Sequence, residues 1–327
     1  MNKLLKILIF IITTSFISSH LYASEVVRLE NKIFDNSIYK PSKNEILELL
    51  KKEGNNKYWY GLYLGNEKIG WAAIESRTYQ SDKFNQPVFE MDGKFNLSVK
   101  VSGNDGTSFL SSTKFSLNEI YQAKAPFKLI EHHENYQIDE TESSILAEAQ
   151  GLNFKIEYKD NKEKNSTEIL LENLDYSLYD TLATYAWYAN NTKKINDVVS
   201  NIEFSFQDLK YILTQNTIEE ITKKKVSGVD FTYYKVNSLD RGEIEEENLS
   251  FQSLIDQDGL EIKFFIGDFE LRLETEKNAK NTELVSDVFV DLGIVVENSF
   301  PPDFYDKNSS MVTYEVIGDA SSIYKKG

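Results

Sequence analysis

Hydrophobic and polar residues alternate along most of this chain, which is the pattern of strands with one dry face and one wet face. In residues 94–101 (KFNLSVKV) the apolar positions are every second residue, and lysine, asparagine or serine lies between them. The same alternation recurs at residues 152–158, 202–206, 260–264 and 269–273. Strands of this kind are antiparallel far more often than parallel. The pattern therefore predicts an extended antiparallel sheet of about a dozen strands.

Turn residues separate these alternating runs at hairpin intervals. The turn pairs include Gly65-Asn66, Asp92-Gly93, Asp258-Gly259 and Gly267-Asp268. Gly65-Asn66 divides the aromatic stretch YGLYLGNEKIGWAAIE at residues 60–75, and we expect this stretch to form the first hairpin. Whether Trp71 in its second strand faces the core or a groove is left open by the pattern.

Two segments have helical spacing instead. Ser42 and Glu45 have the spacing of a capping box, and the apolar stripe that follows ends at Gly54, where a positive φ is expected at the helix C-terminus. In LDYSLYDTLATYAWYANN, Ser177 and Asp180 form an acidic variant of the same box, which predicts a helix over 177–190 packed on the sheet.

The predicted fold class is mainly β (α+β): a large curved antiparallel sheet, or incomplete barrel, with one or two packed helices. The predicted segments are a signal peptide at 1–23, a polar lead-in and capped helix at 24–56, an antiparallel β domain at 57–298 with its helix near 177–190, and a linker with the start of a further strand at 299–327.

The N-terminus has the features of an export signal. Lys3 and Lys6 precede the apolar run ILIFIITTSFI, which is too short to span a bilayer, and Ala23 is a small residue at the expected cleavage point. We expect cleavage after Ala23, a periplasmic or extracellular location, and no stable membrane span once the signal is removed. The alternative is a retained N-terminal anchor.

Charge and cysteine content narrow the function classes. Loss of residues 1–23 leaves 304 residues (327 − 23) and removes two lysines, so the formal net charge changes from −16 to −18. This balance argues against nucleic acid and anionic membrane surfaces as partners. The chain has no cysteine, which excludes disulfides and thiolate chemistry.

Candidate chemistry is sparse. His132 and His133 are adjacent, so on a strand they point to opposite faces and cannot readily chelate one metal together. A weak surface site with Glu131 and Glu134 is the alternative to a solvated strand, and the solvated strand is the preferred interpretation. No cofactor, metal or catalytic residue is predicted.

The other candidates are also better explained as structural features. Asp256-Gln257-Asp258-Gly259 resembles the start of a calcium loop, but Gly267 occupies the twelfth position, where such a loop has glutamate. A hairpin turn is therefore predicted. The acidic run at 243–247 indicates a solvated loop, and none of the common hydrolase, zincin or nucleotide-binding motifs occurs.

The stretch YWYGLYLGNEKIGWAAIESRTY is similar to the opening of the β-rich N-terminal region of bacterial secreted transglutaminase-like proteins. YDTLATYAWYANN, SLIDQDGLEIKFFIGDFELRLETEKNA and SFPPDFYDKNSSMVTYEVIG resemble later parts of that region in the same order, over roughly residues 57–320. The Cys, His and Asp set of the family's catalytic domain has no counterpart here. A sheet with packed helices also resembles LolA-type periplasmic lipoprotein carriers, which hold an acyl chain.

Three functions follow as hypotheses. The first is a secreted, non-catalytic binding or accessory module for a protein, peptide or envelope component. The second is a carrier of a lipid or other hydrophobic ligand. The third is a carboxylate-dependent hydrolase, for which the sequence offers 52 acidic residues but no way to select two.

Overall fold

The computed structural model describes residues 25–28, 38–102, 108–160, 165–190, 192–226, 229–241, 249–281, 312–314 and 324–326. The predicted signal peptide, the acidic run at 243–247 and most of the predicted C-terminal linker lie outside these residues. The predicted domain boundaries therefore stay predictions. None of the helices in the described residues is long and apolar enough to cross a bilayer.

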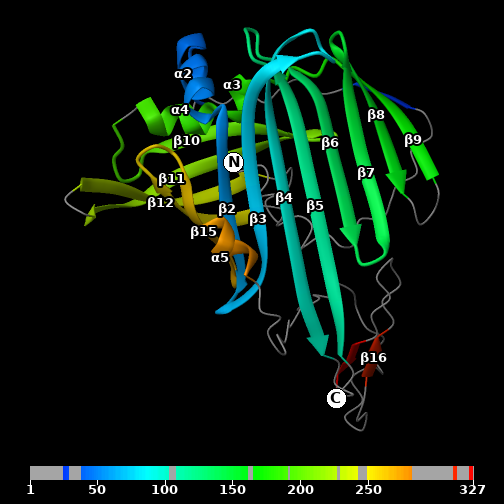
Figure 1. Ribbon diagram of the computed structural model, residues 1–327, viewed down its shortest axis with the longest axis vertical. Coiled ribbons are helices and arrows are strands. Elements are labelled where there is room, and N and C mark those ends of the chain that lie inside the picture. Colours follow the sequence, from blue (N-terminus) through cyan, green and yellow to red (C-terminus); the bar gives the residue numbers. More distant parts are fainter. Residues whose placement is uncertain are drawn as a thin grey trace, which may run out of the picture.

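Strands dominate the described residues (Figure 1). The first half of the chain contains β1 (Glu25–Arg28), β2 (Asn55–Leu64), β3 (Glu67–Ser81), β4 (Gln86–Ser102), β5 (Ser108–Gln122), β6 (Leu129–Ile138), β7 (Thr141–Gln150), β8 (Asn153–Asp160) and β9 (Asn165–Glu172). The second half contains β10 (Val198–Ser205), β11 (Lys210–Val226), β12 (Val229–Arg241), β13 (Leu249–Asp256), β14 (Glu261–Ile266), β15 (Phe269–Glu274), β16 (Val312–Tyr314) and β17 (Tyr324–Lys326). The helices are α2 (Lys43–Glu53), α3 (Leu178–Thr181), α4 (Ala183–Asn190) and α5 (Glu276–Lys280).

In the part of the chain that the structure describes, fifteen strands form one sheet in the order β1-β9-β8-β7-β6-β5-β4-β3-β2-β15-β14-β13-β12-β11-β10. Two antiparallel meanders, β2 to β9 and β10 to β15, are joined where β15 pairs with β2. Among the paired strands of the described residues, β1 alone is parallel to its neighbour, β9. The protein is thus mainly β, with one large antiparallel sheet and few helices, as the alternation predicted.

The sheet curls so that its two ends meet. In Figure 1 the long strands β4 to β7 run along the molecule, while β10 to β12 run across it. Phe154 and Ile156 of β8 share one buried cluster with Phe204 of β10 and with Phe206, although β8 and β10 are near opposite ends of the sheet order. The Tyr158 hydroxyl also donates to the Phe206 carbonyl at 2.6 Å. Side chains, and not a strand ladder, therefore join the two ends.

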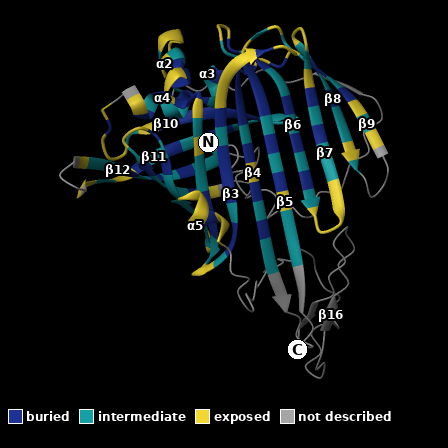
Figure 2. Cartoon of the chain, in the orientation of Figure 1, coloured by how far each residue is buried: buried dark blue, intermediate teal, exposed yellow. Residues whose placement is uncertain are grey.

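The predicted alternation at 94–101 lies in β4 and gives the expected burial. Phe95 and Leu97 are 3% and 8% exposed, whereas Lys94 is exposed and Asn96 is half-buried. The inner faces of β2 to β5 and β13 to β15 together form a second buried cluster. Figure 2 shows buried residues along β3 to β5 and exposed residues at the end of β3 and at the β6–β7 turn. Trp71 lies on the outer face, with its ring centroid 5.5 Å from that of Trp59.

The capping box of α2 forms as predicted, since the Ser42 amide donates to the Glu45 carboxylate at 2.7 Å and the Glu45 amide to the Ser42 hydroxyl at 3.3 Å. The expectation of a positive φ at Gly54 is wrong, because its φ is −68°. The chain passes directly into β2 there, and a Cβ on Gly54 would lie 2.4 Å from the Leu50 carbonyl oxygen. Close packing, and not a left-handed turn, explains this glycine.

The predicted helix over 177–190 is divided into α3 and α4 at Leu182. The Ser177 amide donates to the Asp180 carboxylate at 3.0 Å, as the acidic capping box requires. Leu178, Leu182 and Ala186 pack into the same cluster as Phe204. This segment carries the chain from β9, near one end of the sheet, to β10 at the other, so it fills the space between them.

Candidate functional site

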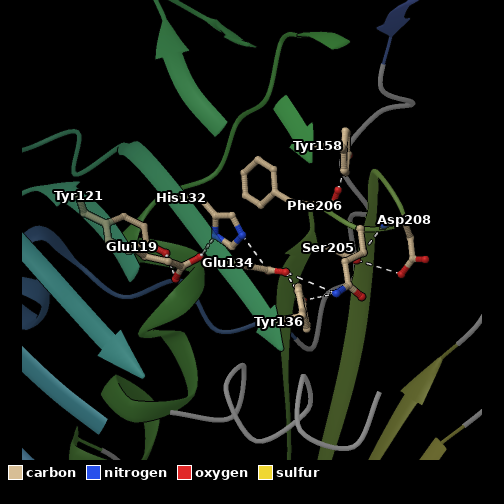
Figure 3. Close-up of polar contacts among 10 residues, drawn as sticks. Glu119, Tyr121, His132, Glu134, Tyr136, Tyr158, Ser205, Phe206 and Asp208 are labelled. Carbon is tan, nitrogen blue, oxygen red and sulfur yellow. Dashed lines mark hydrogen bonds and ion pairs between the residues drawn. The ribbon is translucent and has the colours of Figure 1, made fainter. Parts of the chain in front are cut away.

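A chain of polar side chains crosses the core where the turn after β10 covers the inner face of β5 and β6 (Figure 3). Glu119 of β5 is paired in register with His132 of β6, and Glu134 is two residues further along β6. His132 Nδ1 lies 2.9 Å from a Glu119 carboxylate oxygen, and Nε2 lies 2.8 Å from one of Glu134. These three residues are 0%, 0% and 2% exposed. An imidazole is therefore held between two buried carboxylates.

Hydroxyl groups extend this chain in both directions. The Tyr121 hydroxyl donates to Glu119 at 2.8 Å and lies 3.0 Å from the Thr181 hydroxyl, which donates to Tyr176 at 3.1 Å. At the other end, the Tyr136 hydroxyl donates to Glu134 and accepts from the Gln207 side-chain amide. The network thus links β5 and β6 to α3 and to the turn that follows β10.

The His132 ring also stacks on Phe206, with centroids 4.1 Å apart and planes inclined by 22°. Phe206 and Gln207 lie in the turn between β10 and β11, so the network joins the two meanders of the sheet. Histidine provides both an apolar face for this stacking and two polar nitrogens for the carboxylates. One side chain can therefore pack on Phe206 and contact both Glu119 and Glu134.

The tyrosines of the network are donors and not acids at neutral pH. Burial, and then the charge of Glu119, raises the pKa of Tyr121 well above its ordinary value. Burial and the charge of Glu134 do the same to the pKa of Tyr136. The tyrosine hydroxyls therefore act as fixed hydrogen-bond donors to the two carboxylates, and the network is a rigid polar part of the core.

These shifts predict loss of stability at alkaline pH. Burial raises the pKa of several tyrosines well above 10.0, among them Tyr60, Tyr121, Tyr136, Tyr176 and Tyr185. A raised folded-state pKa leaves stability intact below about pH 10 and removes it above, by about 1.4 kcal/mol per tyrosine and pH unit. Urea unfolding at several pH values between about 9 and 11.5 would measure this. An unfolding midpoint that is constant over this range would contradict the assignment.

The sequence-based interpretation of His132 as part of a solvated strand is wrong. The two histidines do point to opposite faces, as their spacing predicted, and His133 is half-buried. The face that receives His132 is the interior, because Phe206 and Gln207 come from a distant part of the chain to cover it. The only sequence signal is the alternation of Glu119 with Tyr121, and of His132 with Glu134 and Tyr136, which puts each set on one face.

No metal centre is formed in the part of the chain that the structure describes, where no group of three His, Asp or Glu side chains has metal-binding geometry. Asp256 is at a hairpin turn, as predicted. Its carboxylate accepts from the amides of Asp258 and Leu260 at 2.9 and 2.8 Å, and Gly259 has a φ of 86°.

A surface cleft lies close to the polar chain. Three segments line it: residues 38–41 before α2, the turn between β5 and β6 at Pro126 and Lys128, and residues from Asp175 to Asp180 around the start of α3. The remaining lining residue is Ile202 of β10. The volume of the cleft is about 370 Å³, within the range of small-ligand pockets. Backbone pairing fixes these walls, because the Leu178 amide donates to the Phe127 carbonyl at 3.0 Å.

The cleft has a largely apolar lining with charged residues of both signs. Its apolar lining comes from Ile38, Pro41, Pro126, Ile202 and the rings of Tyr39 and Tyr179. Its acidic residues are Asp175 and Asp180, and the Asp180 carboxylate is already engaged in capping α3. Lys40 and Lys128, by contrast, form no ion pair within the described residues. The sequence did not predict this cleft, because its three lining segments and Ile202 are far apart along the chain.

Comparisons with protein-family models and with curated proteins find no match. Among solved structures, the chain is similar to a crystal structure described as a beta-barrel-like protein of domain of unknown function DUF1849 from Brucella abortus. The two share 10% sequence identity, with a TM-score of 0.38, over 67% of this chain and 94% of that chain. The resemblances to transglutaminase-like proteins and to LolA-type carriers stay predictions from sequence.

Proposed function

We propose that this protein is a secreted, non-catalytic binding module that holds a short acidic peptide segment of a partner protein in the cleft between α3 and β10. The observation that carries the proposal is the cleft itself, which combines an apolar lining with two lysines that lack an acidic partner in the described residues. A peptide with an apolar side chain beside a carboxylate matches both features.

Secretion supports the choice of partner. The signal-like N-terminus directs the protein to the periplasm or the cell exterior, where the partner would be an envelope or extracellular protein. An accessory role beside a separately encoded transglutaminase-like enzyme is one form of this function, and it rests on the order of the sequence motifs alone.

A lipid carrier needs free space on the inner face of its sheet. Here Phe204 and Phe206 from one end of the sheet pack against Phe154 and Ile156 near the other end, and Leu182 of the connecting helix segment lies in the same cluster. An acyl chain would have to displace these side chains. The packing therefore favours a peptide in the surface cleft over a lipid in the interior.

Lys128→Glu is expected to weaken peptide binding at least tenfold, because it reverses a charge on the cleft rim. The probe is a fluorescent heptapeptide library with apolar and acidic residues, and fluorescence anisotropy measures the affinity of the best binder. Lys124→Glu is the matched control, since Lys124 is exposed on the same turn but does not line the cleft. The proposal fails if the wild-type protein binds no member, or if both variants bind equally well.

A further inference from the structure

Strand β10 is the last strand in the order of the sheet within the described residues. Its residues pair with β11 from Val198↔Thr217 to Ser205↔Lys210 without a register shift. On the other side, the only pairing within the described residues is an isolated parallel bridge between Ile38 and Ser200. Within the described residues, the segment before α2 thus pairs with β10 at this one position.

The bridge between Ile38 and Ser200 shows which backbone groups of β10 point away from β11. The Tyr39 amide donates to the Ser200 carbonyl at 3.4 Å, so the backbone groups of Ser200 point away from β11. In an antiparallel pair, alternate residues direct both their N–H and C=O groups to the same side. Ile202 lies two residues further along β10. Its N–H and C=O therefore also point away from β11.

Pro41 explains why the bridge ends. If the parallel ladder continued, the residue two positions after Tyr39 would donate its N–H to the Ile202 carbonyl. That residue is Pro41, which has no N–H. The next residue, Ser42, already caps α2, so the chain turns away. Within the described residues, no hydrogen bond reaches the edge-facing groups of Ile202.

An unpaired backbone residue is costly at this position. Ile202 is only 2% exposed, and buried backbone groups are almost always hydrogen-bonded. Ile202 also lines the cleft, together with Ile38 and Pro41, which lie on either side of the point where the ladder stops. The cleft is therefore the space that the next stretch of the added strand would have occupied.

We infer that the peptide binds in extended form and pairs its main chain with Ile202, next to the bridge that Ile38 makes with Ser200 of β10. This inference rests on the proposed function and adds the mode of recognition. Addition of a strand to a sheet edge is a common way to bind peptides, in which main-chain hydrogen bonds give affinity and side-chain pockets give specificity. An acidic residue would lie toward Lys40 and Lys128.

Backbone methylation of the best heptapeptide binder tests the inference with the full chain. Methylation of one peptide nitrogen should lower affinity at least tenfold, while methylation of the adjacent nitrogens has a smaller effect, because alternate N–H groups of an extended peptide face one side. Amide exchange measured by NMR should slow at least tenfold at Ile202 on binding. The Glu203 amide is the control, because it faces β11 and should not change.

The two proposals fail in different ways. If the peptide binds in a Lys128-dependent manner but tolerates methylation at every position and leaves Ile202 exchange unchanged, strand addition is wrong and the cleft function stands. If no peptide binds, both are wrong. If methylation is harmful but Ile202 exchange is unchanged, the peptide is extended at another edge and the inference is also overturned.

Discussion

His132→Leu is expected to lower the free energy of unfolding by about 3–5 kcal/mol. The histidine lies between two buried carboxylates, with its nitrogens 2.9 Å from Glu119 and 2.8 Å from Glu134. Leucine fills a similar space against Phe206 but leaves both carboxylates without the polar partner between them. Urea denaturation followed by circular dichroism measures the loss.

His133→Leu is the matched control, because the neighbouring histidine points to the opposite face and is half-buried. It should change stability by about 0.5 kcal/mol or less. A further variant with Glu119→Gln, His132→Leu and Glu134→Gln should recover part of the loss, since it removes the buried charges together with their partner. Equal stability of His132→Leu and His133→Leu would show that the polar chain does not hold the two meanders together.

Leu97→Asp is expected to destabilise the protein by more than about 3 kcal/mol. Leu97 is 8% exposed and lies in the buried cluster on the inner face of the sheet, opposite Gly70 on β3 and Thr113 on β5. An aspartate at this position would be a charge in an apolar environment. Thermal unfolding followed by circular dichroism measures the effect.

Asn96→Asp is the control for this variant. Asn96 is the next residue on β4 but belongs to the opposite face, where Lys114 of β5 is its register partner. A carboxylate there lies beside a cation and water, so only a small change is expected. If Leu97→Asp is no less stable than Asn96→Asp, the assignment of the inner face is wrong.

Local patterns accounted for the elements themselves. The alternation at 94–101 and at 269–273 predicted strands that the structure contains, because side chains on a strand alternate whatever the strand pairs with. The capping residues Ser42 and Asp180 likewise marked helix starts, since a cap satisfies amides only a few residues away. The break at Leu182 was not predicted, because the apolar spacing continues across it.

Nonlocal contacts decided the sites. Nothing in the sequence around His132 shows that Phe206 will stack on it, and nothing around Ile202 shows that Pro41 will end a strand beside it. Both depend on the order of strands in the sheet and on its curl, which bring together residues separated by more than 70 positions along the chain in each case.

The sequence by itself thus determined that the chain forms antiparallel strands with one dry face, that helices begin at Ser42 and Ser177, and that no cysteine chemistry is available. The tertiary structure alone decided which dry faces meet, that a histidine and two glutamates are buried between them, and that Ile202 of β10 lines a cleft. The physical reason is that periodicity and capping act over a few residues, whereas burial and strand order are properties of the whole curled sheet.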